Sequence, residues 1–276
     1  QGWNVIGVSL KMPVWKGKRS FAHAKRVCQK LKVPYFILDV QPDFQKKVID
    51  YFVAEFKNCK TPNPCIICNR YLKFKKLFQL AKKMRAKYVA TGHYARKREI
   101  KNEKLKIKNY ELLQAKDKNK DQTYNLCFLT QNQLKYIVFP LGNYTKEKIY
   151  QIAKEQDFDF LSKKKPSQDF CYLSDKSLSS FLKEKIGKKP GEIRDTKGNI
   201  LGEHQGLHFY TIGQRKGIEL SRGPWFVKDF DIKKNILVVT KKQKTIIKKE
   251  VFLSPFNFVS GQAPKKKIKV MAKVRY

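Results

Sequence analysis

Three of the six cysteines of this 276-residue chain lie close together, in the segment CKTPNPCIICNRYLKF (59–74). Cys65 and Cys68 form a Cys-x-x-Cys pair behind a Pro-Asn-Pro sequence, and the residues from Asn69 onward have the apolar spacing of a helix. Such a pair can bind zinc, pack in a core or supply a reactive thiol. These three interpretations predict different partners elsewhere in the chain.

Zinc is the weakest interpretation, because a structural site needs four ligands, commonly two Cys pairs or one pair with closely spaced histidines. There is no second Cys-x-x-Cys, and the four histidines are scattered, so we expect no metal site. Packing stays open, since buried cysteines are common. A reactive thiol has a mechanism: Cys68 in the first turn of a helix that begins at Asn69 would gain thiolate character from the helix dipole, with Lys73 and Lys75 nearby.

Two further segments carry groups capable of chemistry. Cys171 lies in KKKPSQDFCYLSD, where periodicity predicts a half-buried strand cysteine, and spacing alone does not show whether it meets Cys68. KDQTYNL (120–126) fits a capped helix start, but its first three residues also suit a phosphate and a base edge. The segment GEHQGLHFYTIGQRKG (202–217) reads mainly as structural turns. The remaining cysteines, at positions 28, 59 and 127, are interpreted as structural.

Charge indicates the class of partner. Lys and Arg number 61 against 23 Asp and Glu, giving a formal net charge of +38, which favours a polyanion such as nucleic acid. Compositional drift toward lysine is the alternative. No apolar run approaches the ~18 residues of a membrane helix, and no signal peptide is visible, so no membrane partner is expected. The cysteines are too sparse for a disulfide framework, which favours a reduced, cytoplasmic setting.

The elements that must position these groups alternate between strand and helix. Strands are predicted over 4–10, 34–40 and 87–95, and helices over 20–31, 42–56, 69–86 and 145–156. This order predicts a doubly wound α/β domain, in which ligands lie beyond the carboxyl ends of the strands. A hairpin is expected over 100–114. From about residue 190 the pattern becomes short strands and glycine turns, including a pair over 224–243, which predicts a small linking domain and the start of a β-barrel.

Six motifs, in order, closely resemble the tRNA-specific 2-thiouridylase family: TPNPCIICNRYLKF, ATGHYAR, DQTYNLCFLTQ, FPLGNYTKEKI, KKKPSQDFCYL and LGEHQGLHFYTIGQRKG. The resemblance covers nearly the whole chain and is far more specific than a single Cys-x-x-Cys. It implies a Rossmann-like ATP-pyrophosphatase domain over 1–165, a central linking and tRNA-binding domain over 166–218, and over 219–276 the start of a C-terminal β-barrel that is expected to be truncated. The activity implied is a sulfurtransferase that thiolates C2 of the wobble uridine of tRNAs for Lys, Glu and Gln.

The resemblance also implies roles for individual residues. Cys68 matches the nucleophile and Cys171 the cysteine that carries a persulfide, and the two can form a disulfide during turnover. Leu10 and Gly92 match ATP contacts. Contacts to the target base are matched by Asn63, Pro64 and Cys65. Contacts to tRNA are matched by His93, Lys120, Asp121, Gln122, Arg275 and Tyr276.

The implied chemistry needs ATP with Mg²⁺ to turn the uridine oxygen into a leaving group, and a donor, either a cysteine desulfurase or a relay protein, to supply persulfide sulfur. The family's Ser-Gly-Gly-x-Asp-Ser loop, expected before the strand at Asn4, is not among these residues. We therefore expect an incomplete chain with little ATP-dependent activity by itself. The alternatives are a catalytically inactive tRNA-binding relative that has lost this loop, a zinc-dependent RNA-binding module and an ATP-pyrophosphatase acting on a small molecule.

Overall fold

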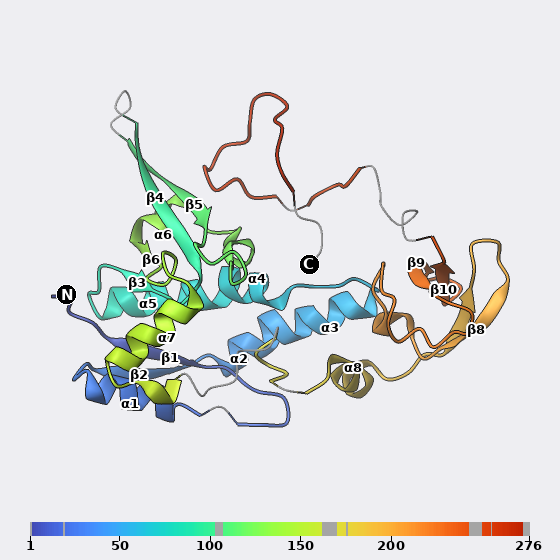
Figure 1. Ribbon diagram of the computed structural model, residues 1–276, viewed down its shortest axis with the longest axis horizontal. Coiled ribbons are helices and arrows are strands. Elements are labelled where there is room, and N and C mark those ends of the chain that lie inside the picture. The colour runs from blue at the N-terminus through green and yellow to red at the C-terminus, as the bar shows by residue number, and fades with distance from the viewer. Residues whose placement is uncertain are drawn as a thin grey trace. The chain divides into compact units, whose positions relative to one another are not determined.

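The computed structural model of the chain describes residues 2–18, 20–102, 107–161, 170–174, 176–242, 250–254 and 256–272 (Figure 1). The chain divides into two compact units. Unit 1 consists of residues 1–68 and 165–253, and unit 2 consists of residues 69–164 and 254–276. Sequence-distant segments therefore share a unit, and each unit has its own core.

Unit 1 begins with a parallel strand pair, as predicted. β1 (Gly7–Lys11) pairs with β2 (Tyr35–Asp39) in the register Gly7 to Tyr35, and α1 (Ala22–Lys30) connects them. The two strands run side by side in Figure 1. Cys28 is buried in α1, and a Cβ built on Gly7 would lie 2.4 Å from its Sγ. Glycine at position 7 therefore lets helix and strand approach closely.

A long helix follows β2 and forms much of the core of unit 1. It comprises α2 (Gln41–Phe44), the π-helical turn η1 (Gln45–Ile49) and α3 (Asp50–Lys57), in agreement with the helix predicted over 42–56. Its buried side chains recur at helical spacing, which fits an amphipathic helix with one face in the core. They are Phe44, Val48, Ile49, Phe52 and Phe56.

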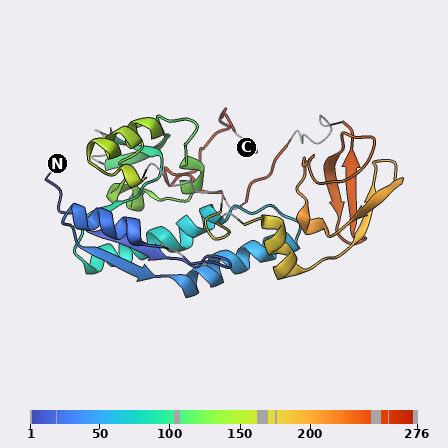
Figure 2. The same ribbon diagram turned by 60° about the horizontal axis from the view of Figure 1, so that its bottom comes forward.

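The later part of unit 1 forms a small β domain. After α8 (Leu178–Ile186), four strands form one sheet in the order β8-β7-β10-β9 (gold to orange-red in Figure 2). Their bounds are β7 Gly191–Arg194, β8 Ile200–His204, β9 Phe226–Asp231 and β10 Ile236–Thr240. The antiparallel pair of β9 and β10 confirms the strand pair predicted over 224–243. Strands on both sides of residue 219 belong to this sheet.

Unit 2 contains the rest of the α/β pattern. The helical segments are η2 (Asn69–Lys73), α5 (Phe74–Lys83), η3 (Thr123–Leu126), α6 (Gln131–Tyr136), α7 (Lys146–Glu155) and η4 (Asp159–Leu161). β3 (Val89–Ala90) pairs in parallel with β6 (Ile137–Val138). β4 (Ala95–Asn102) and β5 (Ile107–Gln114) form the predicted hairpin, with longer strands than expected.

Two strand predictions were wrong in extent. The strand expected over 87–95 pairs only at Val89–Ala90, and the chain then turns into the hairpin. The β-like character expected after 243 is not realised in residues 250–254 and 256–272, where the structure has only turns and irregular backbone. Ile268 and Val270 alternate with lysines, as in a strand, but both are exposed. Alternation forms a strand only where a neighbouring backbone supplies hydrogen bonds.

Candidate functional site

The Cys-x-x-Cys segment forms the start of a helical run, not the turn before it. α4 spans Pro64–Cys68 and continues through η2 into α5. Asn63 caps it: its Oδ1 accepts hydrogen bonds from the backbone N–H of Cys65 (3.0 Å) and Ile66 (3.2 Å). Pro64 takes the first helical position, where proline has no N–H to lose and its fixed φ fits the helix.

This early start corrects the dipole argument for Cys68. The helix begins at Pro64 and not at Asn69, so Cys68 lies more than a turn inside it, beyond the amides that concentrate positive potential. Cys65 occupies the first turn instead, and the amides there are already bonded to Asn63. Cys68 is only 7% exposed, whereas Cys65 is half-buried. The predicted nucleophilic role of Cys68 therefore depends on its family match and its surroundings.

Cys171 lies in a turn, so the predicted strand is wrong, although the predicted half-burial is confirmed. Its neighbours Phe170 and Tyr172 are both buried and fix the turn from either side. Phe170 packs on Phe52 with ring centroids 4.7 Å apart, and Tyr172 packs edge-on against Phe181 at 5.7 Å. Two neighbours buried on either side of a half-buried thiol hold it in place at the surface of an aromatic core.

The segments that carry Cys68 and Cys171 both pack against the long helix of residues 41–57. α4, which ends with Cys68, packs against η1 of this helix. Phe44 and Phe52 of the same helix contact Tyr172 (6.1 Å) and Phe170 (4.7 Å), the neighbours of Cys171. Segments separated by about a hundred residues therefore share one supporting element, a proximity that spacing along the sequence did not show.

A second set of contacts fixes the Cys171 turn to the loop after β1. The backbone N–H of Trp15 donates to the carbonyl of Tyr172 (2.8 Å), and the indole Nε1–H donates to Glu184 Oε1 of α8 (3.1 Å). Lys16 Nζ lies 2.5 Å from Glu184 Oε2, and Lys176 Nζ donates to the carbonyls of Trp15 and Lys16. The hydrogen bonds from Lys16 and from the Trp15 indole hold the Glu184 pKa well below its usual value, at about 2.

His93, predicted as a tRNA contact, is buried just past the end of β3. Lys73 Nζ donates to His93 Nε2 (3.4 Å), and His93 Nδ1 bonds with Thr91 Oγ1 (2.9 Å). An ammonium group can only donate hydrogen bonds, so His93 Nε2 is the acceptor and Nδ1 carries the proton. Burial, and secondarily the charge of Lys73, lowers the His93 pKa to about 3, so the ring is neutral at physiological pH.

The structure brings the segment 120–122 next to His93, and much of its polar capacity is used internally. Tyr94, which follows His93, donates its N–H to Gln122 Oε1 (3.1 Å), and its carbonyl accepts from the Gln122 N–H (2.9 Å). Asp121 accepts from the Ala115 N–H (2.9 Å) and the Thr123 hydroxyl (2.6 Å). Lys120 is the exposed member of the three. The structure therefore favours Lys120 over Asp121 as the group available to an external anion.

The predicted ATP contacts lie near strand ends. Leu10 is the penultimate residue of β1, and Gly92 is exposed two residues after β3. Among the described residues, a Cβ built on Gly92 would meet only Leu141 Cδ1, at 3.7 Å, so there is room for a ligand. The sequence contains no Ser-Gly-Gly-x-Asp-Ser segment. Within these 276 residues, the fit to ATP therefore rests on two positions near strand ends.

Several side chains singled out in the sequence have structural roles. His204 and His208 are buried and bond to the carbonyls of Asn235 and Gly187 (both 3.1 Å), and burial lowers the pKa of each. Cys59 packs against the core of the β domain, and burial raises its pKa, as it does for Cys127. Cys28 is the buried residue of α1, whereas Cys127 follows a short 3₁₀ helix.

The motif TIGQ at 211–214 forms a turn that docks the Cys-x-x-Cys segment on the β domain. The hydroxyls of Thr61 and Thr211 lie 3.0 Å apart, and Gln214 Oε1 accepts from the Thr211 N–H (3.0 Å). The predicted tRNA contacts Arg275 and Tyr276 lie outside the described residues. Within the described part of the chain, no cluster of three or more His, Cys, Asp or Glu side chains could hold a metal ion. None of the described helices is long and apolar enough to cross a membrane.

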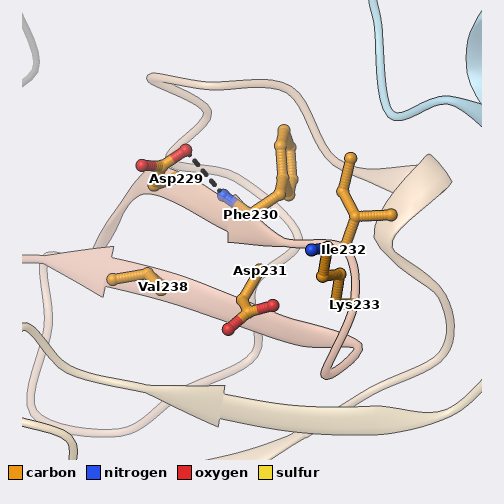
Figure 3. Close-up of a pocket in the computed structure, with 6 residues that line it drawn as sticks. All are labelled: Asp229, Phe230, Asp231, Ile232, Lys233 and Val238. Carbon is orange, nitrogen blue, oxygen red and sulfur yellow. Dashed lines mark hydrogen bonds between the residues drawn. The ribbon is translucent and has the colours of Figure 1, made fainter.

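An open groove of about 440 Å³ lies on β9 and β10, lined by Asp229, Phe230, Asp231, Ile232, Lys233 and Val238 (Figure 3). The backbone N–H of Phe230 donates to Asp229 Oδ1 (2.9 Å). No predicted site residue lines the groove. Its two carboxylates would repel a polyanion, so the groove is a poor candidate for an RNA site.

Comparison with known domain families identifies the class of protein to which this chain belongs. Residues 1–175 match the family described as tRNA methyl transferase HUP domain, and residues 179–241 match the tRNA methyl transferase PRC-barrel domain. The class is therefore a Rossmann-like HUP domain joined to a small barrel-like domain, which confirms the predicted fold class.

Curated relatives narrow the class further. The chain is 40% identical over 292 positions to tRNA-specific 2-thiouridylase MnmA of Clostridium perfringens (strain 13), covering all of this chain and 79% of the relative. It is 40% identical over 291 positions to MnmA 2 of Thermoanaerobacter sp. (strain X514), and 41% over 293 positions to MnmA 2 of Caldanaerobacter subterraneus subsp. tengcongensis. Each comparison covers the whole chain and 78% of the relative. The chain belongs to the MnmA-type tRNA-specific 2-thiouridylase family.

Sequence reasoning missed three features that the structure places near the predicted groups. The Lys73–His93 contact joins two motifs twenty residues apart; the sequence analysis noted Lys73 as a nearby charge and His93 as a match to a tRNA contact, but not that the two meet. Asn69 is 3% exposed and donates to the Asn125 carbonyl (3.0 Å), while its buried Oδ1 has no hydrogen-bond partner among the residues that the structure describes. The Trp15 contacts carried no sequence signal, because a single tryptophan in a loop has no periodicity.

Proposed function

We propose that this protein is a tRNA-uridine 2-sulfurtransferase that thiolates C2 of the wobble uridine in tRNAs for Lys, Glu and Gln. The observation that carries the proposal is the identity of about 40% over the whole chain to relatives named tRNA-specific 2-thiouridylase. The formal charge of +38 supports a polyanionic substrate. A cytoplasmic location is part of the proposal.

The two cysteines differ in a way that suits two different tasks. Cys171 is half-buried, whereas Cys68 is buried. A cysteine that receives sulfur from a donor protein must be reachable, and a resolving cysteine benefits from shielding against stray oxidants. Both are carried by segments packed on the helix of residues 41–57. This arrangement supports Cys171 as the persulfide carrier and Cys68 as the nucleophile that resolves it.

In the proposed reaction, Cys171 carries a persulfide whose terminal sulfur attacks C2 of the uridine. ATP, when bound with Mg²⁺, supplies the adenylyl group that makes the C2 oxygen a leaving group. The Cys68 thiolate then attacks the inner sulfur, on Cys171: a Cys68–Cys171 disulfide forms, the sulfur–sulfur bond to the transferred atom breaks, and 2-thiouridine leaves with that electron pair. Alternatively, Cys68 attacks first and frees sulfide, which then attacks C2. A thiol reductant must reduce the disulfide before the next turnover.

The remaining predicted contacts complete the proposal. Asn63, Pro64 and Cys65 would meet the target base from the first turn of α4, and Lys120 would meet a tRNA phosphate. Leu10 and Gly92 would contact the adenine side of ATP. A cysteine desulfurase or a relay protein would supply the sulfur. The division into domains over 1–165, 166–218 and 219–276 remains a prediction.

The test is formation of 2-thiouridine by the native gene product, with ATP, a persulfide donor, a thiol reductant and an unmodified tRNA transcript, followed by nucleoside mass spectrometry. Cys68→Ser and Cys171→Ser should abolish the product, and Cys127→Ser, a matched half-buried cysteine, should retain it. Alkylation should trap the persulfide on Cys171. Full activity of Cys171→Ser would contradict the proposed pathway. Tight tRNA binding without thiolation would favour the inactive tRNA-binding relative.

The role of the phosphate loop can be tested separately. Because these 276 residues contain no Ser-Gly-Gly-x-Asp-Ser segment, we propose that they do not support ATP-dependent thiolation alone. The native gene product and the 276-residue chain should be assayed side by side. Robust ATP-dependent turnover by the 276-residue chain would refute this part of the proposal and leave the sulfurtransferase assignment intact.

A further inference from the structure

Lys73 has surroundings that are unusual for a structural lysine. The residue is half-buried in the π-helical turn η2, directly after the segment that carries Cys68. Its Nζ donates to His93 Nε2 (3.4 Å), a neutral acceptor, and among the described residues no carboxylate pairs with it. Partial burial of an ammonium group without a counter-charge is unfavourable, and a bound anion would compensate for it.

Lys97 of the same unit shows what a structural half-buried lysine looks like. Its Nζ donates to the carbonyls of Leu134 and Ile137, both at 2.8 Å, and lies over the Tyr110 ring at 4.7 Å from the centroid. The Lys97 ammonium is thus satisfied by the protein itself. Within the described part of the chain, Lys73 has one long contact, to a neutral ring, which leaves most of its hydrogen-bonding capacity for a ligand.

The imidazole that orients Lys73 is itself held rigidly. His93 stacks on Phe74 (centroids 5.9 Å apart, 24° between planes) and meets the edge of Phe139 at 6.5 Å. Thr91 accepts its Nδ1–H, which fixes the tautomer that presents a lone pair to Lys73. With only 7% of its surface exposed, His93 has little surface to offer a ligand. Its geometry suits a positioning residue.

Gly92, the neighbour of His93 in sequence, has room around it among the described residues, since a Cβ built there would meet only Leu141 Cδ1, at 3.7 Å. Gly92 precedes His93, is exposed, and follows the carboxyl end of β3, the edge at which α/β domains bind phosphorylated ligands. A π-helical turn such as η2 is also frequent at functional sites. We propose that the Lys73 ammonium, oriented by His93 and Thr91, binds a phosphate group of the substrates at the Gly92 edge. The inference takes its candidate phosphates, the tRNA backbone and the nucleotide, from the proposed function.

Four proteins test the inference: wild type, Lys73→Met, Lys73→Arg and Lys75→Met, all as the native gene product. Lys75 is an exposed lysine two residues further on and is the matched control. Binding of an unmodified tRNA transcript is measured by fluorescence anisotropy over a salt series, and binding of ATP by calorimetry. Melting curves establish that each variant is folded.

We expect Lys73→Met to lower the affinity for one of the two ligands, tRNA or ATP, by roughly tenfold. Lys73→Arg should restore most of that affinity. Lys75→Met should change either affinity by less than about twofold. If the phosphate belongs to tRNA, the slope of log K against log salt falls by about 0.7–0.9. If it belongs to ATP, the calorimetric affinity falls and the salt slope for tRNA is unchanged. The His93 ring resonances should shift on binding in wild type and not in Lys73→Met.

Unchanged affinities and an unchanged salt slope in a folded Lys73→Met protein would overturn the inference. So would a loss of affinity in Lys73→Met no larger than the loss in Lys75→Met. Failure of Lys73→Arg to restore binding would also overturn it, because the loss would then come from altered packing around residue 73 and not from the missing charge. A wild-type protein that binds tRNA and ATP but forms no 2-thiouridine refutes the proposed function alone. A wild-type protein that binds neither ligand overturns both.

Discussion

Removing the cap of α4 should loosen the segment that carries Cys68 by a predictable amount. In Asn63→Ala, the amides of Cys65 and Ile66 lose the Oδ1 acceptor at 3.0 and 3.2 Å, and the helical run from Pro64 loses its first-turn bonds. Loss of an N-cap of this kind costs about 1 kcal/mol, within a range of roughly 0.5–2 kcal/mol. At the start of a helix this cost applies mainly to local opening.

Alkylation of Cys68 reads out that opening. The side chain is 7% exposed, so labelling requires an open state, and a local destabilisation of about 1 kcal/mol should raise its labelling rate about fivefold. Peptide mass spectrometry separates Cys68 from Cys171, whose rate serves as the internal reference. Asn63→Ser keeps a good capping group and should stay within about twofold of wild type.

A folded Asn63→Ala protein that labels Cys68 at the wild-type rate would refute the capping argument. The same would follow if Asn63→Ser were as fast as Asn63→Ala, because the cap would then not be the cause. Comparing thiolation by Asn63→Ser separates the two roles of this residue: stability retained with activity lost would support the proposed contact between Asn63 and the target base.

The remaining predictions concern one buried histidine of unit 2 and two packing contacts of unit 1. Since the His93 pKa is lowered from 6.5 to about 3, the unfolded chain takes up a proton at His93 below about pH 6.5 and the folded protein does not, so this contribution to stability is lost as pH falls from 6.5 toward 3. His93→Phe should flatten that part of the pH profile of the denaturation midpoint, and an unchanged profile would contradict the prediction. Phe181→Ala should cost about 3–5 kcal/mol and speed Cys171 labelling, because Phe181 is fully buried against Trp15 and Tyr172, whereas Phe181→Leu should cost less; equal denaturation midpoints would be inconsistent with this packing. Gly7→Ala should cost about 1–3 kcal/mol, because its Cβ would lie 2.4 Å from Cys28 Sγ, and Cys28→Ala should recover part of that loss; strictly additive effects would argue against the clash.

Long elements with regular periodicity were predictable from the sequence. The helices over 20–31, 42–56 and 145–156 and the parallel pairing of the first two strands are all present, because apolar spacing decides which face enters the core. Thr145 caps the last of these helices, accepting from the Lys148 N–H (3.3 Å). The start of the helix at Pro64 was missed, since Asn63 and Pro64 read as a turn when their capping bonds are not known.

The candidate site was also predictable only in part from the sequence. Residue types and order were enough to single out Cys68, Cys171, Gly92 and His93, and charge was enough to indicate a polyanionic partner. The sequence did not show that His93 is buried and neutral, because burial depends on Phe74 and Phe139, which reach it only in the folded chain. Nor did it show that Asp121 and Gln122 are used mainly within the protein.

By itself, therefore, the sequence determined the chemical groups, the periodic elements and the family. Only the tertiary structure decided that the segments of Cys68 and Cys171 pack on one helix, and that Lys73 has a neutral ring and no carboxylate for a partner among the described residues. The physical reason is that periodicity is a local property of the chain. Contacts between residues 44 and 172, or 73 and 93, depend on how separate elements pack, and no spacing rule encodes that.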